Sequence, residues 1–129
     1  MTTPAPWPVR PPAAGLVIVG QSYGAFTATL AASLLPTRLL VLLAGMIPVP
    51  DRARAGGGKV PATARPFRSR PDVPTKFILF QDDRIFPAAF MRRLAQERLD
   101  TVPDEVPGCH CAALSHPSEL SELLVHYLA

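Results

Sequence analysis

The stretch LVIVGQSYG, residues 16–24, decides the fold. Leu16 to Val19 form a short apolar run without polar alternation, which is typical of a strand covered on both faces in a parallel sheet. Residues 23–35 are rich in Ala, Thr and Leu and stop at a proline, which predicts a helix. The stretch therefore predicts a buried strand, a very tight turn and a helix in direct succession.

Gly20 to Gly24 in this turn form a G-x-S-x-G motif. So tight a turn forces Ser22 into a strained backbone conformation and leaves its hydroxyl free above the sheet. We expect side chains at positions 20 and 24 to collide, which explains glycine at both. The helix start would aim the Tyr23 N–H at an oxyanion forming on a substrate. A simpler interpretation is that small residues only make a sharp turn.

Further elements follow along the chain. Residues 38–44 and 76–80 predict two more buried strands, and residues 104–107 predict a short one. Residues 87–99 predict a helix with Phe90, Met91 and Leu94 on its apolar side. A last helix would be capped by Ser115 and have Pro117 in its first turn, with apolar residues recurring at Leu120, Leu123, Leu124, Tyr127 and Leu128. This order predicts an α/β fold with a mostly parallel sheet of three to four strands and flanking helices.

From Gly15 to its end, apart from residues 46–75, the chain resembles the α/β-hydrolase family. In that family the catalytic acid follows a later strand, commonly as Asp-x-x-x-Pro, and Asp83 to Pro87 match directly after KFILF. The resemblance makes Asp83 the candidate acid, with Asp82 as the alternative.

The family's histidine lies between the last strand and the final helix, commonly after a glycine. Gly108-Cys109-His110 occupies that place, so His110 is the candidate and His116 the alternative. His126 lies within the last predicted helix, and we expect it to be structural. The order Ser22, Asp83, His110 is that of α/β hydrolases. The resemblance therefore implies a serine hydrolase that acts on small carboxylic esters through a Ser-His-Asp triad.

The chain departs from the family at its beginning. Domains of this kind commonly run to about 200–250 residues, whereas this chain has 15 residues before its first predicted strand. We therefore expect a Pro-rich disordered lead-in over 1–14 and a truncated domain over 15–129, without the N-terminal half of the sheet. In the family, the loop after one of those missing strands donates the second oxyanion-hole N–H, and the loss of one such donor typically lowers turnover by about 10²–10³. We therefore expect the isolated chain to be weakly active or inactive.

That truncation would leave residues 16–19 as an open sheet edge. Such an edge favours pairing with a second copy or with a complementing N-terminal fragment. The alternative function is thus a non-catalytic hydrolase remnant that acts as a protein-interaction module through this edge.

The positive charge of the chain is concentrated in residues 51–76. Seven basic and two acidic side chains there give a local charge of +5 within a total of +3. The segment lacks interleaved aromatic residues and helical spacing, so we expect no nucleic-acid partner. Residues 46–75 instead predict a flexible basic segment at the position where the family has a lid.

The cysteines point to neither a disulfide nor a metal. Cys109 and Cys111 flank His110 and lie too close in sequence for ordinary disulfide geometry, and they would leave a zinc ion short of a ligand. We expect no metal and no cofactor. The longest apolar run, residues 39–47, is too short to cross a membrane, and the N-terminus shows no signal peptide. A cytoplasmic protein without a membrane partner is the resulting expectation.

Overall fold

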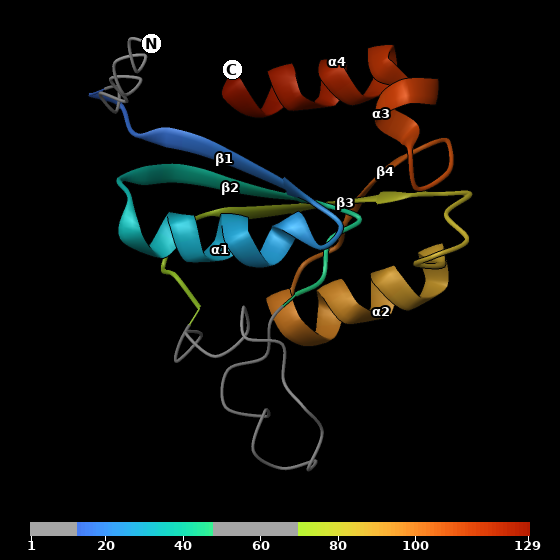
Figure 1. Cartoon of the computed structure of the whole chain (residues 1–129), viewed down its shortest axis with the longest axis horizontal. Coiled ribbons are helices and arrows are strands. Elements are labelled where there is room, and N and C mark those ends of the chain that lie inside the picture. The colour runs from blue at the N-terminus through green and yellow to red at the C-terminus, as the bar shows by residue number, and fades with distance from the viewer. Residues whose placement is uncertain (1–12, 48–69) are drawn as a thin grey trace, which may run out of the picture.

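The computed structural model describes residues 13–47 and 70–129. Along this part of the chain the elements are β1 (Leu16–Gln21), α1 (Gly24–Leu34), β2 (Thr37–Leu43), β3 (Thr75–Phe80), α2 (Ala88–Leu99), β4 (Asp104–Val106), α3 (Ala112–Ser115) and α4 (Pro117–Leu128). The strands form one sheet in the order β1-β2-β3-β4, and every neighbouring pair is parallel. The predicted α/β fold with a parallel sheet is confirmed (Figure 1).

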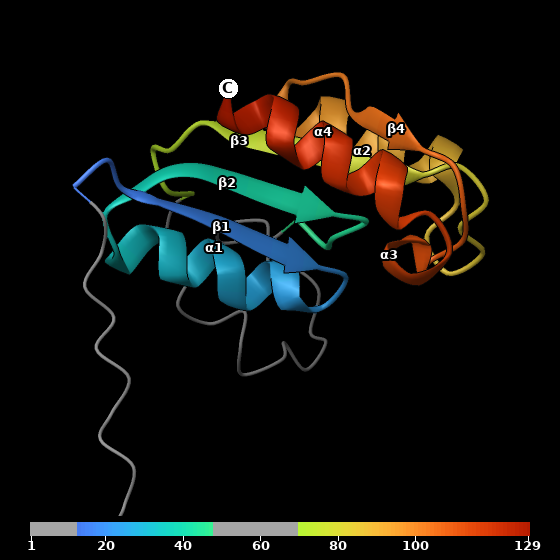
Figure 2. The same ribbon diagram turned by 90° about the horizontal axis from the view of Figure 1, so that it is seen from above.

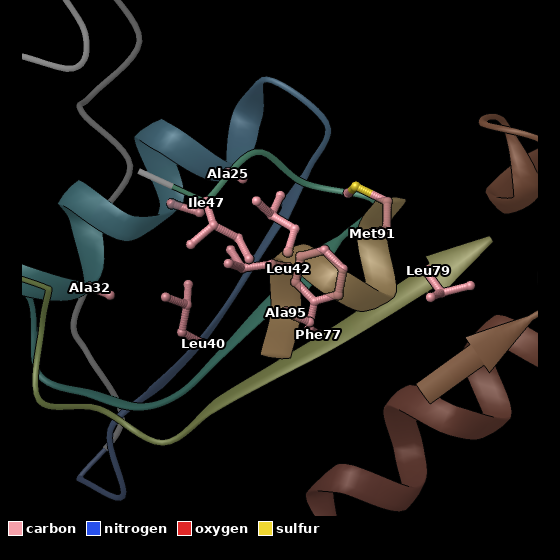
Figure 3. Close-up of a cluster of buried hydrophobic side chains, with 11 residues drawn as sticks. Ala25, Ala32, Leu40, Leu42, Ile47, Phe77, Leu79, Met91 and Ala95 are labelled. Carbon is pink, nitrogen blue, oxygen red and sulfur yellow. The ribbon is translucent and has the colours of Figure 1, made fainter. Parts of the chain in front are cut away.

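Helices cover both faces of this sheet. Figure 1 shows α1 and α2 on one face and α4 on the other, and Figure 2 shows α4 crossing above the strands. Side chains of a strand alternate between the two faces, so β2 contributes to both cores. Leu40 and Leu42 belong to the core with α1 and α2 (Figure 3), whereas Val41 and Leu43 belong to the core with α4. Burial on both sides explains why β2 lacks polar alternation.

The last helix keeps most of its predicted apolar stripe but not its predicted cap, and Leu128 at the end of the stripe is 46% exposed. Leu120 is buried in the core, and Leu123, Leu124 and Tyr127 pack against it. α4 begins directly after His116, with Pro117 in its first turn and no side-chain cap from the described residues. The expected cap Ser115 lies instead in α3, a short helix that the sequence did not predict.

In α2, one residue of the predicted apolar side lies at the surface. Met91 and Leu94 are buried, but Phe90 is 41% exposed. The Phe90 ring lies beneath the Arg93 guanidinium, 5.6 Å from the ring centroid. A cation above an aromatic face compensates part of the missing burial.

The predicted lead-in and most of the predicted basic segment fall on residues 1–12 and 48–69, outside the described residues. In the part that is described, no helix combines the length and the apolar character needed to span a membrane.

Candidate active site

Ser22 follows β1 in the tight turn that the sequence predicts. Its φ angle is +52°, in the left-handed region that residues other than glycine seldom adopt. Backbone hydrogen bonds hold this conformation: Ser22 N–H donates to the Leu43 carbonyl at 2.9 Å, and the Ser22 carbonyl accepts from Ala25 and Met46, each at 3.2 Å. The strain at Ser22 is thus balanced by bonds to both β2 and α1.

The two glycines of the motif have different reasons to be glycine. A Cβ at Gly20 would lie 2.5 Å from the Ala28 Cβ and 2.9 Å from the Gly24 carbonyl oxygen. A Cβ at Gly24 would meet nothing within 4 Å. The expectation of a collision at position 24 is therefore wrong, because a side chain on this first residue of α1 would extend into open space. Gly20 alone is required by close packing of the turn against α1.

Asp83 lies beyond the end of β3, and its side chain is fully buried. One carboxylate oxygen, Oδ1, accepts hydrogen bonds from the Ile85 and Phe86 N–H groups at 2.8 and 2.9 Å. These bonds fix the carboxylate and leave its second oxygen, Oδ2, facing His110. The alternative acid Asp82 is exposed and accepts a hydrogen bond from Gly108 N–H at 3.1 Å, so it holds the loop that carries the histidine.

His110 is held at the end of β4 by contacts on both sides of its loop. Asp82 N–H donates to the Gly108 carbonyl at 3.0 Å, and Gln21 Nε2 donates to the His110 carbonyl at 2.9 Å. The Phe86 ring lies edge-on to the imidazole, with 5.4 Å between the centroids. Together these contacts place a ring that is 17% exposed between Ser22 and Asp83.

Ser22, His110 and Asp83 form one hydrogen-bonded series. Ser22 Oγ lies 2.9 Å from His110 Nε2, and His110 Nδ1 lies 2.7 Å from Asp83 Oδ2. Because a carboxylate only accepts, the ring proton of the neutral imidazole belongs on Nδ1, and Nε2 is free to accept from the serine hydroxyl. A hydroxyl, a neutral imidazole and a buried carboxylate in this order can transfer the hydroxyl proton to the ring.

The other histidines do not reach this series. His116 Nδ1 lies 2.8 Å from the Ser115 hydroxyl, and a Cβ at Gly108 would come within 2.5 Å of the same nitrogen. His116 therefore packs against the Gly108 turn. His126 is an exposed residue of α4 whose ring lies against that of Tyr127.

The cysteines beside His110 are both exposed, and neither is in a disulfide. Among residues 13–47 and 70–129, no cluster of three or more His, Cys, Asp or Glu side chains is arranged to hold a metal ion.

Three contributors to the site were not predicted from the sequence. Gln21 supports the histidine loop and Phe86 packs on the imidazole. At Gly45 a Cβ would lie 2.7 Å from the Ala25 Cβ, so glycine there lets the segment after β2 pass beneath the start of α1. For Gln21 and Phe86 the only available signal was their position inside the two motifs.

A backbone donor lies beside the nucleophile. Within the described residues no backbone carbonyl accepts from the Tyr23 N–H, which lies in the turn before α1. The Tyr23 side chain is 55% exposed and its ring meets Phe26 edge-on, so it points away from the sheet core. The N–H is the part of Tyr23 that can serve the site.

Comparison with known proteins identifies this architecture. No protein-family model and none of the curated proteins matches the chain. Among solved structures, BpoC from Mycobacterium tuberculosis H37Rv, assigned as a non-heme bromoperoxidase, matches with a TM-score of 0.59 and 19% identity over 87% of this chain and 66% of its own. The CarC enzyme, a serine hydrolase involved in carbazole degradation, matches with a TM-score of 0.55 and 19% identity over 90% of this chain and 64% of its own.

A third match is MGS-MChE2, an α/β hydrolase from the sediment metagenome of the Mar Chica lagoon in Morocco. Its TM-score is 0.53 and its identity 16%, over 88% of this chain and 61% of its own. Five solved structures that resemble the chain are longer than it is, and the chain spans 58–66% of their length. The chain therefore has part of the α/β-hydrolase fold, and its Ser-His-Asp series lies at the carboxyl ends of the parallel strands.

Proposed function

We propose that this protein is a serine hydrolase that acts on carboxylic esters, with Ser22 as nucleophile, His110 as general base and Asp83 as the residue that orients His110. The observation that carries the proposal is the unbroken hydrogen-bonded series Ser22 Oγ, His110 Nε2, His110 Nδ1 and Asp83 Oδ2. A serine hydroxyl is a weak nucleophile at neutral pH, and an adjacent base is what activates it.

In the reaction, Ser22 Oγ bonds to the ester carbonyl carbon while its proton passes to His110 Nε2. The buried Asp83 carboxylate stabilises the resulting imidazolium. When the tetrahedral intermediate collapses, the bond to the alcohol oxygen breaks and His110 returns the proton to the alcohol. A water molecule, deprotonated by His110, then attacks the acyl-serine, and the carboxylic acid leaves as Ser22 recovers its proton.

The negative charge on the carbonyl oxygen requires donors, and the Tyr23 N–H is the donor that we assign from the described residues. An oxyanion hole with one donor fewer typically turns over about 10²–10³ times more slowly. Because this assignment supplies a single donor from the described residues, we expect slow turnover. Covalent labelling of Ser22, which requires a single attack by its hydroxyl, is therefore a better test of the proposal than turnover alone.

The test combines both readouts. Purified protein is incubated with a fluorophosphonate probe and analysed by mass spectrometry, and p-nitrophenyl acetate hydrolysis is followed in parallel. We expect labelling at Ser22 and hydrolysis above the buffer rate, and both should be lost in Ser22→Ala. Ser33→Ala is the matched control, because Ser33 is an exposed serine of α1 outside the site. Equal rates for the wild type and Ser22→Ala would overturn the proposal.

A second candidate function is self-association through β1. Within the described residues β1 pairs only with β2, and Val19 is 45% exposed. Leu16 N–H bonds to Pro36 and Ser22 N–H bonds to Leu43, so the alternation along a strand directs the Val17 and Val19 N–H groups away from β2. Such unpaired edge donors accept a further strand, and a second copy supplies one by symmetric pairing.

Light scattering after size-exclusion chromatography tests this candidate. A dimer is expected, and Val19→Pro should dissociate it because proline removes an outward donor without removing a bond to β2. Val19→Thr is the control, since threonine keeps the N–H and the branched side chain. A monomer at all concentrations tested would rule out this function and leave the hydrolase proposal intact.

A further inference from the structure

A small apolar cavity lies between the segment that follows β2 and the helix α2. Its volume is about 130 Å³. Six apolar side chains supply most of the lining: Met46, Ile47, Phe86, Phe90, Met91 and Leu94. Figure 3 shows Ile47 and Met91 in the core cluster on this face of the sheet. We refer to this space as the α2 cavity.

The walls of the α2 cavity directly contact the candidate active site. Met46 N–H donates to the Ser22 carbonyl at 3.2 Å. Phe86 N–H donates to Asp83 Oδ1, and its ring packs edge-on against His110. Two residues of the cavity wall, Met46 and Phe86, therefore contact Ser22 and His110.

The residues that line the cavity differ in burial, which distinguishes its floor from its rim. Met91 and Leu94 are 1% and 6% exposed and form its floor, whereas Phe90 is 41% exposed and stands at its rim. Arg98 also lines the cavity, and its guanidinium donates to the Ile47 carbonyl. The cavity thus has a buried apolar floor and one charged residue in its lining.

Its size limits what can enter. An apolar cavity of about 150 Å³ in another protein holds benzene, a molecule of six carbons. At 130 Å³ the α2 cavity has room for a chain of up to about six carbons. Ordinary ligand pockets of about 300–1,000 Å³ are several times larger.

We propose that the α2 cavity binds the acyl chain of the substrate and that it selects esters of short apolar acids of about four to six carbons. This inference rests on the proposed role of Ser22. The alcohol must leave within reach of His110, whose ring is partly exposed between the exposed Cys109 and Cys111. On this assignment the alcohol leaves toward solvent, and the apolar α2 cavity remains for the acyl chain.

The experiment compares two series of esters. p-Nitrophenyl acetate, butyrate, hexanoate and decanoate vary the acyl chain, while ethyl, butyl and hexyl acetate vary the alcohol. Each kcat/KM is divided by the hydroxide-catalysed rate of the same ester. We expect a rise of up to about fourfold per added acyl methylene as far as hexanoate, no further gain for decanoate, and little dependence on the alcohol. A preference that follows the alcohol chain would overturn the proposal.

Variants of the cavity provide the second arm. Leu94→Ala removes part of the floor and should shift the optimum toward decanoate. If that variant fails to fold, Phe90→Ala at the exposed rim should reduce the advantage of hexanoate over acetate severalfold. Val125→Ala is the control, because Val125 is an exposed residue of α4 on the other face of the sheet. An acyl-length profile unchanged in folded Leu94→Ala or Phe90→Ala would refute the acyl pocket.

The two possible failures are distinguishable. If hydrolysis requires Ser22 but the acyl-length profile is flat, the acyl pocket is wrong and the hydrolase proposal stands. If no ester is hydrolysed in a Ser22-dependent way, the hydrolase proposal fails and the acyl pocket fails with it.

Discussion

Replacing each glycine of the G-x-S-x-G turn by alanine should change stability in opposite directions. In Gly20→Ala the new methyl would lie 2.5 Å from the Ala28 Cβ and 2.9 Å from the Gly24 carbonyl oxygen. Carbon atoms in favourable contact are about 3.5–4.0 Å apart, so one of these groups must move by about 1 Å. Neither neighbour is the end of a flexible side chain, and Ala28 is itself buried.

The magnitude follows from two opposing effects. Overpacking a well-packed site costs about 1–3 kcal/mol, whereas replacing a glycine lowers the entropy of the unfolded chain and stabilises by about 0.4–1 kcal/mol. Gly20→Ala should therefore lower the free energy of unfolding by about 1–2 kcal/mol. Gly24→Ala meets no neighbour within 4 Å and should raise it by about 0.4–1 kcal/mol.

Both variants make the same chemical change, so their unfolded-state effects cancel and the difference between them reports the folded turn. Urea unfolding followed by circular dichroism measures that difference. At a slope of about 2 kcal/mol per molar urea, the two midpoints should differ by about 1 M. Equal destabilisation by the two variants would refute the assignment of close packing to Gly20 alone.

Three further outcomes are expected. Asp83→Asn should lower the rate of Ser22-dependent ester hydrolysis about 10⁴-fold, because the imidazole loses the partner that sets its tautomer. Asp82→Asn should retain most of this activity. Equal losses in the two variants would contradict the separate roles of Asp82 and Asp83. Leu40→Ala, at a residue only 1% exposed, should cost about 2–5 kcal/mol in urea unfolding, and a loss under 1 kcal/mol would show that the core is loose there. Burial of Tyr127 and its hydrogen bond to the Asp104 carboxylate raise the pKa of Tyr127 well above its usual range. As pH rises, the Tyr127 hydroxyl therefore loses its proton at a lower pH in the unfolded state than in the folded state. The free energy of unfolding should fall as pH rises above about 10, and Tyr127→Phe should lack that part of the decline.

The secondary structure could be predicted well because each element has its own signal. The apolar runs of β2 and β3 are buried on both faces, and the apolar stripe of α4 repeats at helical spacing. α3 was missed because its four residues, AALS, are too few to show a period. The cap of α4 was misplaced for the same reason, since α3 includes Ser115.

The sequence predicted which residues are candidates for the site, but not which of two neighbouring candidates takes each place. Asp82 and Asp83 are neighbours, so motif spacing left both open as the acid. The turn after β3 separates them: Asp82 faces the Gly108 N–H, whereas Asp83 is buried against His110. Likewise, His110 and His116 both lie between β4 and α4, and the contacts of the loop with Asp82 and Gln21 place His110 rather than His116 beside Ser22.

The sequence by itself determined the order along the chain of the four strands and of α1, α2 and α4, the strained turn at Ser22 and the kinds of side chain present for chemistry. These features depend on the local conformational preferences of the residues and on the spacing of apolar residues, both of which can be read directly from the sequence. Only the tertiary structure decided that Gln21 and Phe86 support His110, that Gly24 has open space, and that Met46 and Phe86 line a cavity next to the site. Those features arise where residues far apart in the chain meet, and such distances are set by the packing of helices on the sheet.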